Sequence, residues 1–597
     1  MKNFLKTTLA SIIGFLIAGT ILLFVLIGII GSLASSADTT PIVKKNSVLK
    51  ITLNYSIPDR AIPNPFKDFN PRTFKPNPKL GLNSILNSIE NAKYDENIKG
   101  IFLDVVDIRA NFGSMATLEE IRNKLIEFKE SKKFIVAYSN IAFTQKSFYL
   151  SSVADKVYFN PGGMLFWAGM GGEMSFYKKA LNKLGIEPQV VRHGKYKAAV
   201  EPFLLDKMSD ANREQVMKYI GGLWNHMLNG ISKERQISVN KLNQLADDFK
   251  LRDAKELTKQ GFFDGAIYYD EVIDKLKELT KTSKDKKLAT ISLKKYYKVA
   301  AKNKIISKDK VAVIYATGEI GMEQSENSIG PDLANTISKV RKNKKIKAVV
   351  LRVNSPGGSA LTSEIIWREI KLLQKEKPVI VSMGNVAASG GYYISCAADT
   401  IVASPTTITG SIGIFGLFFS GEDLIKNKIG LNTDKFGTNK HSDFGGGNPL
   451  PIPLTSRKLT KYERMVMQEY IEKGYKSFVD KVAEGRNMTF AEIDKIGQGR
   501  VWTGEDALKI GLVDVLGGLE TAINIAKEKA NLAKCTIVNY PKEKDPIAAL
   551  FEGISNEAKS FMMEKELGYS YIYYKQVKNI LKNEGIQARI PYNLEIR

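Results

Sequence analysis

The sequence predicts an α/β protein with a mostly parallel sheet, in which one folding unit is written twice. Residues 98–105 and 346–353 are short apolar runs rich in β-branched residues, as is typical of buried strands. Helical stretches such as 116–131 and 361–376 alternate with such runs, which indicates βαβ units. An apolar run near the N-terminus adds a predicted transmembrane helix ahead of these units.

The apolar run is the first element, and no charged residue occurs from 7 to 37. Residues 9–33 are enough to cross a bilayer, which requires about 20 residues. A cleaved signal peptide is the alternative, although its apolar core would normally span only about 7–15 residues. Lys2 and Lys6 precede the run and no basic residue follows before Lys44. This asymmetry predicts a cytoplasmic segment 1–8, with the bulk of the chain on the outer side.

The duplication is visible as patches that recur in the same order about 250 residues apart. Besides the strands at 98–105 and 346–353, the matched positions are Asn140 with Asn385, 153–155 with 397–399, Pro161 with Pro405, Gly261 with Gly511, and Asp264 with Asp514. We therefore expect a first unit at 46–274, a Lys-rich linker or helical bridge at 275–308, and a second unit at 309–540. The tail 541–597 carries no functional signal in the sequence.

The charge of the chain is concentrated in one segment. The net charge is +24, and the segment 275–310 supplies +10 of it, from thirteen lysines and three acids. Neither a zinc spacing nor a helix-turn-helix pattern accompanies these lysines, so a solvated face or anionic lipid is favoured over nucleic acid. The two cysteines, Cys396 and Cys535, lie far apart in sequence and predict neither a disulfide framework nor a metal cluster.

Two glycine-containing turns in the second unit are candidates for chemistry. Gly357 and Gly358 follow one predicted strand, and Ser389 with Gly390 follows the next. Adjacent glycines let backbone amides approach a substrate carbonyl, and a helix that begins there directs free N–H groups toward developing negative charge. The first unit has Gln-Lys-Ser at 145–147 in place of the Ser-Gly-Gly turn. A turn needed only for folding should look alike in both copies, so the difference favours catalysis.

A nucleophilic serine needs a base, and the sequence offers histidines and lysines. His226 lies in a helical pattern, whereas His193 and His441 lie near candidate lysines, so a Ser–His arrangement stays open. A lysine can serve if burial lowers its pKa from about 10.4 toward neutrality. Lys197 is followed by small apolar residues and an aromatic residue, which is the setting such a base requires.

Three separated stretches, 194–203, 388–392 and 409–416, together resemble the long, duplicated form of bacterial signal peptide peptidase A, also called protease IV. The resemblance covers about residues 47–540 and includes the N-terminal anchor. It implies tandem Clp-protease and crotonase-like domains, built as ββα spirals, in which the second unit supplies the nucleophile and the first supplies the base.

Carried over residue by residue, the resemblance makes Ser389 the nucleophile, Lys197 the general base and Ser411 the residue that orients the lysine amine. Backbone amides near Gly357, Gly358 and Gly390 would then form the oxyanion hole. No metal or cofactor is implied. One ambiguity concerns Lys440, which aligns with Lys197 between the units and matches the position of the base in short family members.

The resemblance also implies a homotetrameric dome on the outer face of the cytoplasmic membrane, which degrades cleaved signal peptides and other hydrophobic peptides. The loop 445–453 is expected near the groove. Two other functions compete: a crotonase-like acyl-CoA enzyme, which the outward-facing domain disfavours because coenzyme A is cytosolic, and a non-catalytic scaffold that binds membrane peptides.

Overall fold

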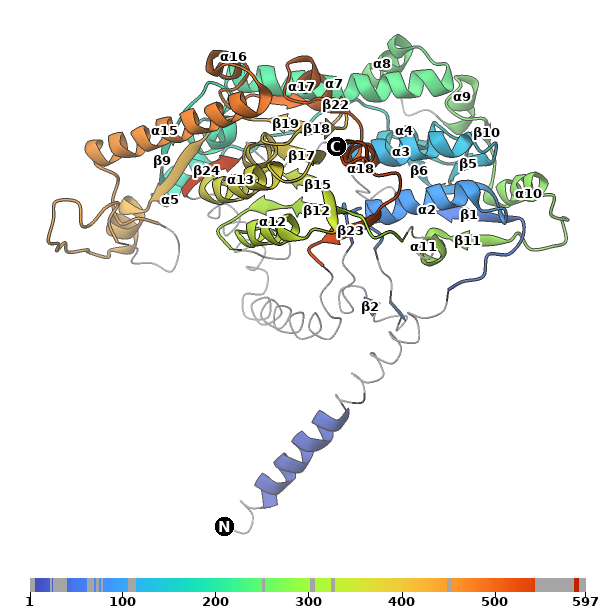
Figure 1. Ribbon diagram of the computed structural model, residues 1–597, viewed down its shortest axis with the longest axis horizontal. Helices are drawn as coiled ribbons and strands as arrows, with labels where there is room; N and C mark the ends of the chain where they lie inside the picture. Colours follow the sequence, from blue (N-terminus) through green and yellow to red (C-terminus); the bar gives the residue numbers. More distant parts are fainter. Residues whose placement is uncertain are drawn as a thin grey trace.

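The computed structural model contains two large, mostly parallel sheets that lie side by side and are covered by helices (Figure 1). The residues described are 6–21, 24, 40–61, 69–70, 75–76, 79–105, 114–249, 253–300, 306–323, 328–447, 454–542 and 585–589. The alternation of strands and helices confirms the predicted α/β class.

The first sheet belongs to the first unit, and all its pairings are parallel. In spatial order its strands are β10 (Gly265–Ala266), β7 (Lys156–Phe159), β5 (Phe134–Ser139), β4 (Ile98–Val105), β1 (Ser47–Ile51) and β11 (Thr290–Ser292). β4 coincides with the predicted strand 98–105. Its residues are almost all buried, as expected for a parallel strand covered on both faces.

The second sheet lies in the second unit and repeats the order of the first along one of its two branches. Its main path runs through β21 (Val501–Thr503), β19 (Ile408–Gly410), β17 (Val379–Ala388), β15 (Ile346–Ser355), β12 (Lys310–Thr317) and β23 (Thr536–Tyr540). β18 (Thr400–Ala403) pairs with β17, and β22 (Val515–Leu516) pairs with β18. β21 runs antiparallel to its neighbour β19, so this sheet is mixed.

Helices follow the strands in both units. In the first unit they are α2 (Leu82–Tyr94), α3 (Met115–Lys129), α4 (Gln145–Ser151), α5 (Lys178–Leu184), η1 (Ala198–Val200), α6 (Glu201–Leu204), α7 (Asp210–Arg235), α8 (Val239–Asp247), α9 (Ala254–Lys259) and α10 (Tyr269–Thr280). The helix α11 (Leu293–Ala300) follows them. In the second unit the helices are α12 (Asp332–Lys342), α13 (Ala360–Gln374), α14 (Gly390–Ser395), the π-helix η2 (Leu424–Ile429), α15 (Lys461–Arg486), α16 (Phe490–Ile496), α17 (Gly504–Lys509) and α18 (Leu519–Lys529).

The two units share local contacts as well as element order. Each has one helix of 26 residues, α7 or α15, which begins at a Ser or Thr cap and ends at a residue in the left-handed conformation. The last arginine of that helix and a strand amide both donate to one aspartate. These residues are Arg235, Val157 and Asp264 in the first unit, and Arg486, Ile401 and Asp514 in the second.

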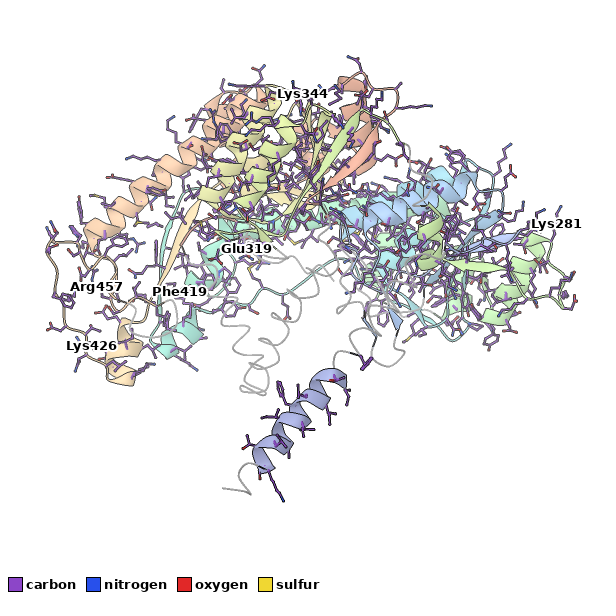
Figure 2. The ribbon with its side chains drawn as sticks, turned by 60° about the horizontal axis from the view of Figure 1, so that its bottom comes forward. Lys281, Glu319, Lys344, Phe419, Lys426 and Arg457 are labelled. Carbon is purple, nitrogen blue, oxygen red and sulfur yellow. The ribbon has the colours of Figure 1, made fainter. Side chains whose placement is uncertain are left out.

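A third sheet joins the units. Its strands, in order, are β14 (Ser328–Ile329), β13 (Glu319–Ile320), β16 (Gly357–Ser359), β24 (Gly585–Arg589), β20 (Phe415–Ser420) and β9 (Glu187–Arg192). β9 comes from the first unit and pairs antiparallel with β20 of the second over six residues. Figure 2 labels Glu319 and Phe419, which mark two strands of this sheet. Two-stranded pairs β2 (Phe69–Asn70) with β3 (Lys75–Pro76), and β6 (Ala142–Phe143) with β8 (Met164–Leu165), complete the strands described.

The expected linker at 275–308 packs as part of the first unit over the residues described. It contains the end of α10, the strand β11, which pairs with β1, and α11. Leu288, Ile291, Leu293 and Tyr296 are buried between its lysines. These spaced apolar side chains anchor the segment to the first sheet, while Lys286, Lys287 and Lys295 beside them are exposed.

The N-terminal segment is helical over residues 6–21, and its apolar side chains are exposed. No helix in the described part of the chain is both long enough and apolar enough to cross a bilayer. Of the expected span 9–33, residues 22, 23 and 25–33 lie outside the described residues.

A buried ionic cluster ties the first unit to the second. Arg352 on β15 donates from Nε to Asp59 at 2.7 Å and from Nη2 to Glu120 of α3 at 2.6 Å. Its Nη1 donates to Ser382 at 2.9 Å. The side chains of Arg352, Asp59 and Glu120 are only 0%, 2% and 6% exposed. Each charge is therefore stabilised by its ionic partners and not by water.

We expect Arg352→Ala to lower the free energy of unfolding by about 3–5 kcal/mol, because two buried carboxylates lose their counter-ion. Arg341→Ala is the matched control, since Arg341 pairs with Glu376 near the surface and such pairs contribute only about 0–1 kcal/mol. Urea titration of both variants measures the difference, and equal midpoints would contradict the role given to the cluster.

Candidate active site

Ser389 lies where β17 ends and α14 begins. Its backbone has φ 55° and ψ −113°, a conformation that is uncommon for a residue other than glycine. The Ser389 N–H donates to the carbonyl of Gly410 at 2.8 Å, which fixes the turn against β19. Strained serine turns between a strand and a helix expose a hydroxyl at the end of a sheet, and strain of this kind clusters at functional sites.

Lys197 reaches this turn from the first unit. Its Nζ lies 2.7 Å from the Oγ of Ser389. The same amine donates to the Oγ and to the backbone carbonyl of Ser411, both at 3.1 Å. The structure therefore brings together the three side chains that the sequence analysis singled out, Lys197, Ser389 and Ser411, and all three are fully buried.

The electrostatic setting of Lys197 is unusual for a lysine. Burial lowers the pKa of its amine well below the usual value of 10.5. The hydrogen-bond partners of Nζ are hydroxyl and carbonyl oxygens, which carry no full charge to offset the lost hydration. The neutral amine is thus favoured, and a neutral amine can accept a proton from a hydroxyl 2.7 Å away.

Glycines make room for the lysine side chain. A Cβ placed on Gly499 would lie 2.7 Å from Cα, Cβ and N of Lys197, and one on Gly413 would lie 3.3 Å from its Cδ. Gly499 has φ +83°, and Gly194 before the lysine has φ +96°, both in the region that favours glycine. A Cβ on Gly194 would lie 2.4 Å from the Gln498 carbonyl oxygen. Side chains at these positions would push the lysine turn away from Ser389.

Buried polar groups hold the lysine turn from the other side. Glu201 in α6 accepts from Asn212 at 2.9 Å and from the Ser209 hydroxyl at 2.5 Å, both at the start of α7. Gln215 on α7 donates to the Tyr196 carbonyl at 3.0 Å and accepts from the Val501 amide at 3.2 Å. The first turns of α7 thus connect the backbone next to Lys197 with β21 of the second unit.

These supporting residues were absent from the sequence analysis. Glu201 and Gln215 look like ordinary surface residues in the sequence, and Gly499 lies in a Gly-Gln-Gly loop at 497–499. The glycine-rich loop just before a strand was the one signal in the sequence for a close contact at this place. It does not predict which side chain packs against the loop.

Two of the three candidate oxyanion glycines, Gly357 and Gly390, lie against each other. Gly357 and Gly358 have φ +95° and +148°, so both need glycine. A Cβ on Gly357 would lie 2.7 Å from the backbone nitrogen of Gly390, and one on Gly390 would lie 3.1 Å from the Cα of Gly357. Gly390 opens α14, and the first N–H groups of a helix have no partner within it. The Gly357 turn therefore lies against the start of α14, next to Ser389, while the Gly357 N–H itself donates to the Ser355 hydroxyl at 3.2 Å.

The competing bases lie elsewhere. Each histidine pairs with a glutamate: His193 Nδ1 lies 2.5 Å from Glu472, and His226 Nε2 lies 3.2 Å from Glu119. His441 Nδ1 lies 3.7 Å from Glu463, and the His441 ring stacks on the ring of Tyr462. Lys440 is exposed in the loop that precedes His441. Of the expected loop 445–453, residues 448–453 lie outside the described part of the chain.

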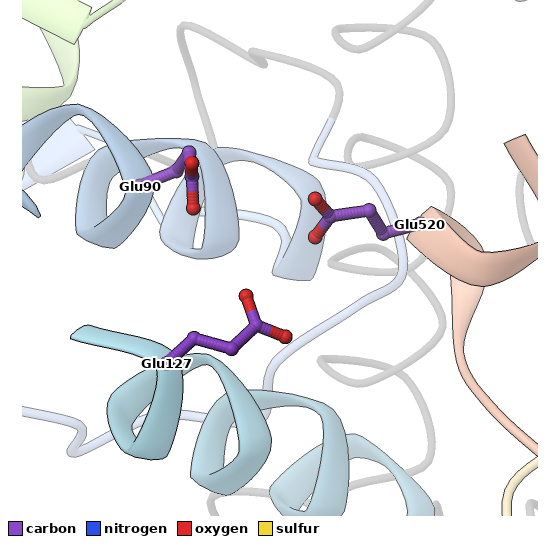
Figure 3. A group of neighbouring side chains, drawn as sticks. All are labelled: Glu90, Glu127 and Glu520. Carbon is purple, nitrogen blue, oxygen red and sulfur yellow. The ribbon is translucent and has the colours of Figure 1, made fainter. Parts of the chain in front are cut away.

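One group of carboxylates could hold a cation, and a lysine fills it. Glu90, Glu127 and Glu520 point toward a common centre (Figure 3). The Nζ of Lys124 lies 3.2, 2.6 and 2.5 Å from their oxygens, respectively. Burial alone would lower the pKa of Lys124, but hydrogen bonds with Glu127 and Glu520 raise it above its usual value. The ammonium thus supplies the positive charge that a metal ion would otherwise bring.

Comparisons with known proteins show the family of this chain. The profile of peptidase family S49 matches residues 127–283 and 371–533, one segment in each unit. A chloroplastic serine protease SPPA of Arabidopsis thaliana is 34% identical over 563 residues, which cover 92% of this chain and 78% of the relative. Protease 4 of Salmonella typhi is 37% identical over 519 residues, which cover 84% of this chain and 81% of that protein.

A shorter relative, named putative signal peptide peptidase SppA, comes from Enterococcus faecium. It is 32% identical over 257 residues, which cover 42% of this chain and 72% of the relative. Less than half of the present chain therefore corresponds to most of that shorter protein. The match of the family profile to both units, together with long relatives aligned over most of their length, shows that this chain belongs to peptidase family S49 and is a hydrolase of the serine-protease class.

Proposed function

We propose that this protease cleaves peptide bonds with Ser389 as nucleophile and Lys197 as general base. The observation that carries the proposal is the 2.7 Å approach of Nζ to Oγ in a fully buried site. The neutral amine takes the hydroxyl proton as Oγ attacks the carbonyl carbon, and the resulting ammonium returns a proton to the leaving amine. Water then hydrolyses the acyl-enzyme with the same amine as base.

In this mechanism two further sets of groups assist catalysis. Ser411 accepts from the amine and orients it toward Ser389, through contacts of 3.1 Å. Backbone amides near Gly357, Gly358 and Gly390 stabilise the negative charge on the carbonyl oxygen, which is the largest electrostatic task in acyl transfer. Removal of one such donor typically costs about 2.7–4 kcal/mol in other serine proteases.

The finer architecture is part of the same proposal. We assign each unit to the Clp-protease and crotonase-like ββα spiral, with boundaries near 46–274 and 309–540. The repeated strand order and the repeated aspartate contacts support two copies of one fold. The base comes from one copy and the nucleophile from the other. The pairing of β9 with β20 supports this arrangement, because it joins the first unit to the second.

We also propose a location and a substrate class. The uncharged segment 7–37 supports a single-pass anchor at 9–33, with the protease units on the outer face of the cytoplasmic membrane. Substrates there would be cleaved signal peptides and other hydrophobic peptides, as the name of the Enterococcus relative suggests. A homotetramer remains our proposal for the assembly, by resemblance to signal peptide peptidase A.

Replacement of either member of the pair should abolish turnover. We expect Ser389→Ala and Lys197→Met each to lower kcat by about 10⁴–10⁶-fold. The nucleophile and its base act as one unit, so the loss of either removes most of the rate enhancement of both. Methionine keeps the length and apolar character of the buried stem, so folding should be retained. Lys440→Met is the matched control and should leave kcat unchanged. A fluorogenic peptide assay measures all three, and full activity of Lys197→Met would refute the base assignment.

The activity should depend on pH through the lysine amine. Because burial lowers the pKa of Lys197, the protonated and inactive form predominates only below that lowered pKa. We expect kcat/KM to rise about tenfold per pH unit in the acidic limb and to level off well below pH 10.5. Initial rates from pH 5 to pH 10, with folding checked by circular dichroism, measure the profile. A limb still rising at pH 10 would mean that the amine keeps its ordinary pKa.

A further inference from the structure

Exposed lysines gather at one end of the parallel strands in the first sheet. They stand just before β1, β5 and β11 and at the second residue of β4, and they are Lys44, Lys45, Lys132, Lys286, Lys287 and Lys99. Strands β11, β1, β4 and β5 are neighbours, so these six lysines line an edge about 15 Å long, here called the amino edge. Figure 2 labels Lys281, at the start of the loop that leads to β11. The three residues that follow the carboxyl ends of β1, β5 and β7 contain no lysine.

The positive charge of the amino edge is not neutralised within the chain. None of the six lysines forms an ion pair with the residues that the structure describes. Three nearby acids face lysines outside the six: Glu130 faces Lys93 at 2.8 Å, Asp155 faces Lys129 at 3.3 Å, and Asp95 faces Lys133, whose Nζ donates to its carbonyl at 2.7 Å. The exposed acids Glu96 and Asp285 remain, so lysines are in clear excess.

Two apolar side chains extend from the same edge. Ile42, two residues before Lys44, is 91% exposed, and Tyr94, at the end of α2 and four residues before β4, is 70% exposed. The ammonium of Lys93 lies 5.7 Å from the centroid of the Tyr94 ring. Lysines beside exposed aromatic and aliphatic side chains are typical of surfaces that lie in the headgroup region of a bilayer.

The length of the chain keeps this edge close to the proposed anchor. Thirteen residues separate the end of the anchor, at residue 33, from Ser47, the first residue of β1. Fully extended, these residues reach about 45 Å at most. A second copy of the chain fits this edge poorly, because two basic edges repel each other. A negatively charged lipid surface is the partner that both the charge and the tether favour.

We propose that the amino edge of the first sheet docks on anionic lipid and holds the protease units against the bilayer. This inference rests on the proposed membrane anchor. The phosphate groups of an acidic phospholipid supply the negative charge that the chain does not, and each lysine held near them strengthens binding about fivefold. The side chains of Ile42 and Tyr94 enter the headgroup region beside them.

Amine labelling of the full-length chain in vesicles tests the proposal. The chain is reconstituted into vesicles of phosphatidylcholine alone or mixed with phosphatidylglycerol and treated briefly with a membrane-impermeant amine reagent. Mass spectrometry then gives the rate for each lysine. We expect the six lysines of the amino edge to react about fivefold more slowly in the mixed vesicles. At about 1 M salt, where the screening length falls to about 3 Å, this difference should disappear.

Lys207 and Lys473 serve as internal controls. Both are exposed and have no ionic partner within the described ranges, but Lys207 precedes α7 and Lys473 lies in α15. Their labelling should be the same in the two vesicle types.

A charge-removal variant makes the test specific. It combines Lys44→Gln, Lys45→Gln, Lys286→Gln and Lys287→Gln, and its Lys99 and Lys132 should react equally fast in both vesicle types. The matched control, Lys207→Gln with Lys473→Gln, should keep the protection of the amino edge. Neither variant should change peptidase activity in detergent, which shows that the fold is intact.

The outcomes separate this inference from the proposed anchor. Equal labelling of the wild-type amino edge in the two vesicle types would overturn lipid docking. Slow labelling already in phosphatidylcholine and in detergent would also overturn it, since a second copy or another protein surface would then cover the edge. Retention on phosphatidylcholine vesicles through an alkaline wash tests the anchor by itself. Release by that wash would refute the anchor, and labelling in the mixed vesicles would still decide the docking.

Discussion

The site depends on one amine, Lys197 Nζ, being kept out of water and within reach of the Ser389 hydroxyl. An isolated buried ammonium is costly, so a lysine in such a place releases its proton instead. Three parts of the chain create this place: the turn that carries the lysine, the Gly413 and Gly499 backbone against which its stem lies, and the Ser389 turn at the end of β17. Each lies in a different segment of the sequence, so the site exists only when both units are folded.

Stability and chemistry oppose each other at this position. The unfolded chain binds a proton at Lys197 at pH values where the folded chain does not, because burial lowers the folded-state pKa. The contribution of this group to folding therefore becomes less favourable as pH falls from 10.5 toward the lowered pKa. Buried contacts between the units, such as Arg352 with Asp59 and Glu120, hold the fold together despite this cost.

Local patterns in the sequence predicted the central parts of the fold well. The strand 98–105 and helices close to 116–131 and 361–376 occur as expected, because apolar period and strand composition are local properties. The repeat predicted two units, and the contrast between Ser389-Gly390 and its counterpart at 145–147 predicted which unit carries the serine. The small apolar residues and the aromatic residue after Lys197 predicted a setting that could lower its pKa, and the structure buries this side chain completely.

The third sheet and the supports of the lysine were beyond sequence reasoning. β9, β20 and β24 come from distant segments, and strand pairing across such distances leaves no periodic signal. The tail strand Gly585–Arg589 is short and follows no turn pattern that distinguishes it from its surroundings. Glu201 and Gln215 act through hydrogen bonds to backbone groups far along the chain, so their residue type alone carries no information about their role.

The protonation state of Lys197 can be measured directly by NMR with lysine labelled at Cε and Nζ. The resonance of this residue is identified by its absence from Lys197→Met, and its chemical shift is followed with pH. Our account predicts a titration well below 10.5, with the neutral amine present in the range where the enzyme turns over. A resonance that stays in its protonated position up to pH 10.5 would contradict it, whatever the distance to Ser389.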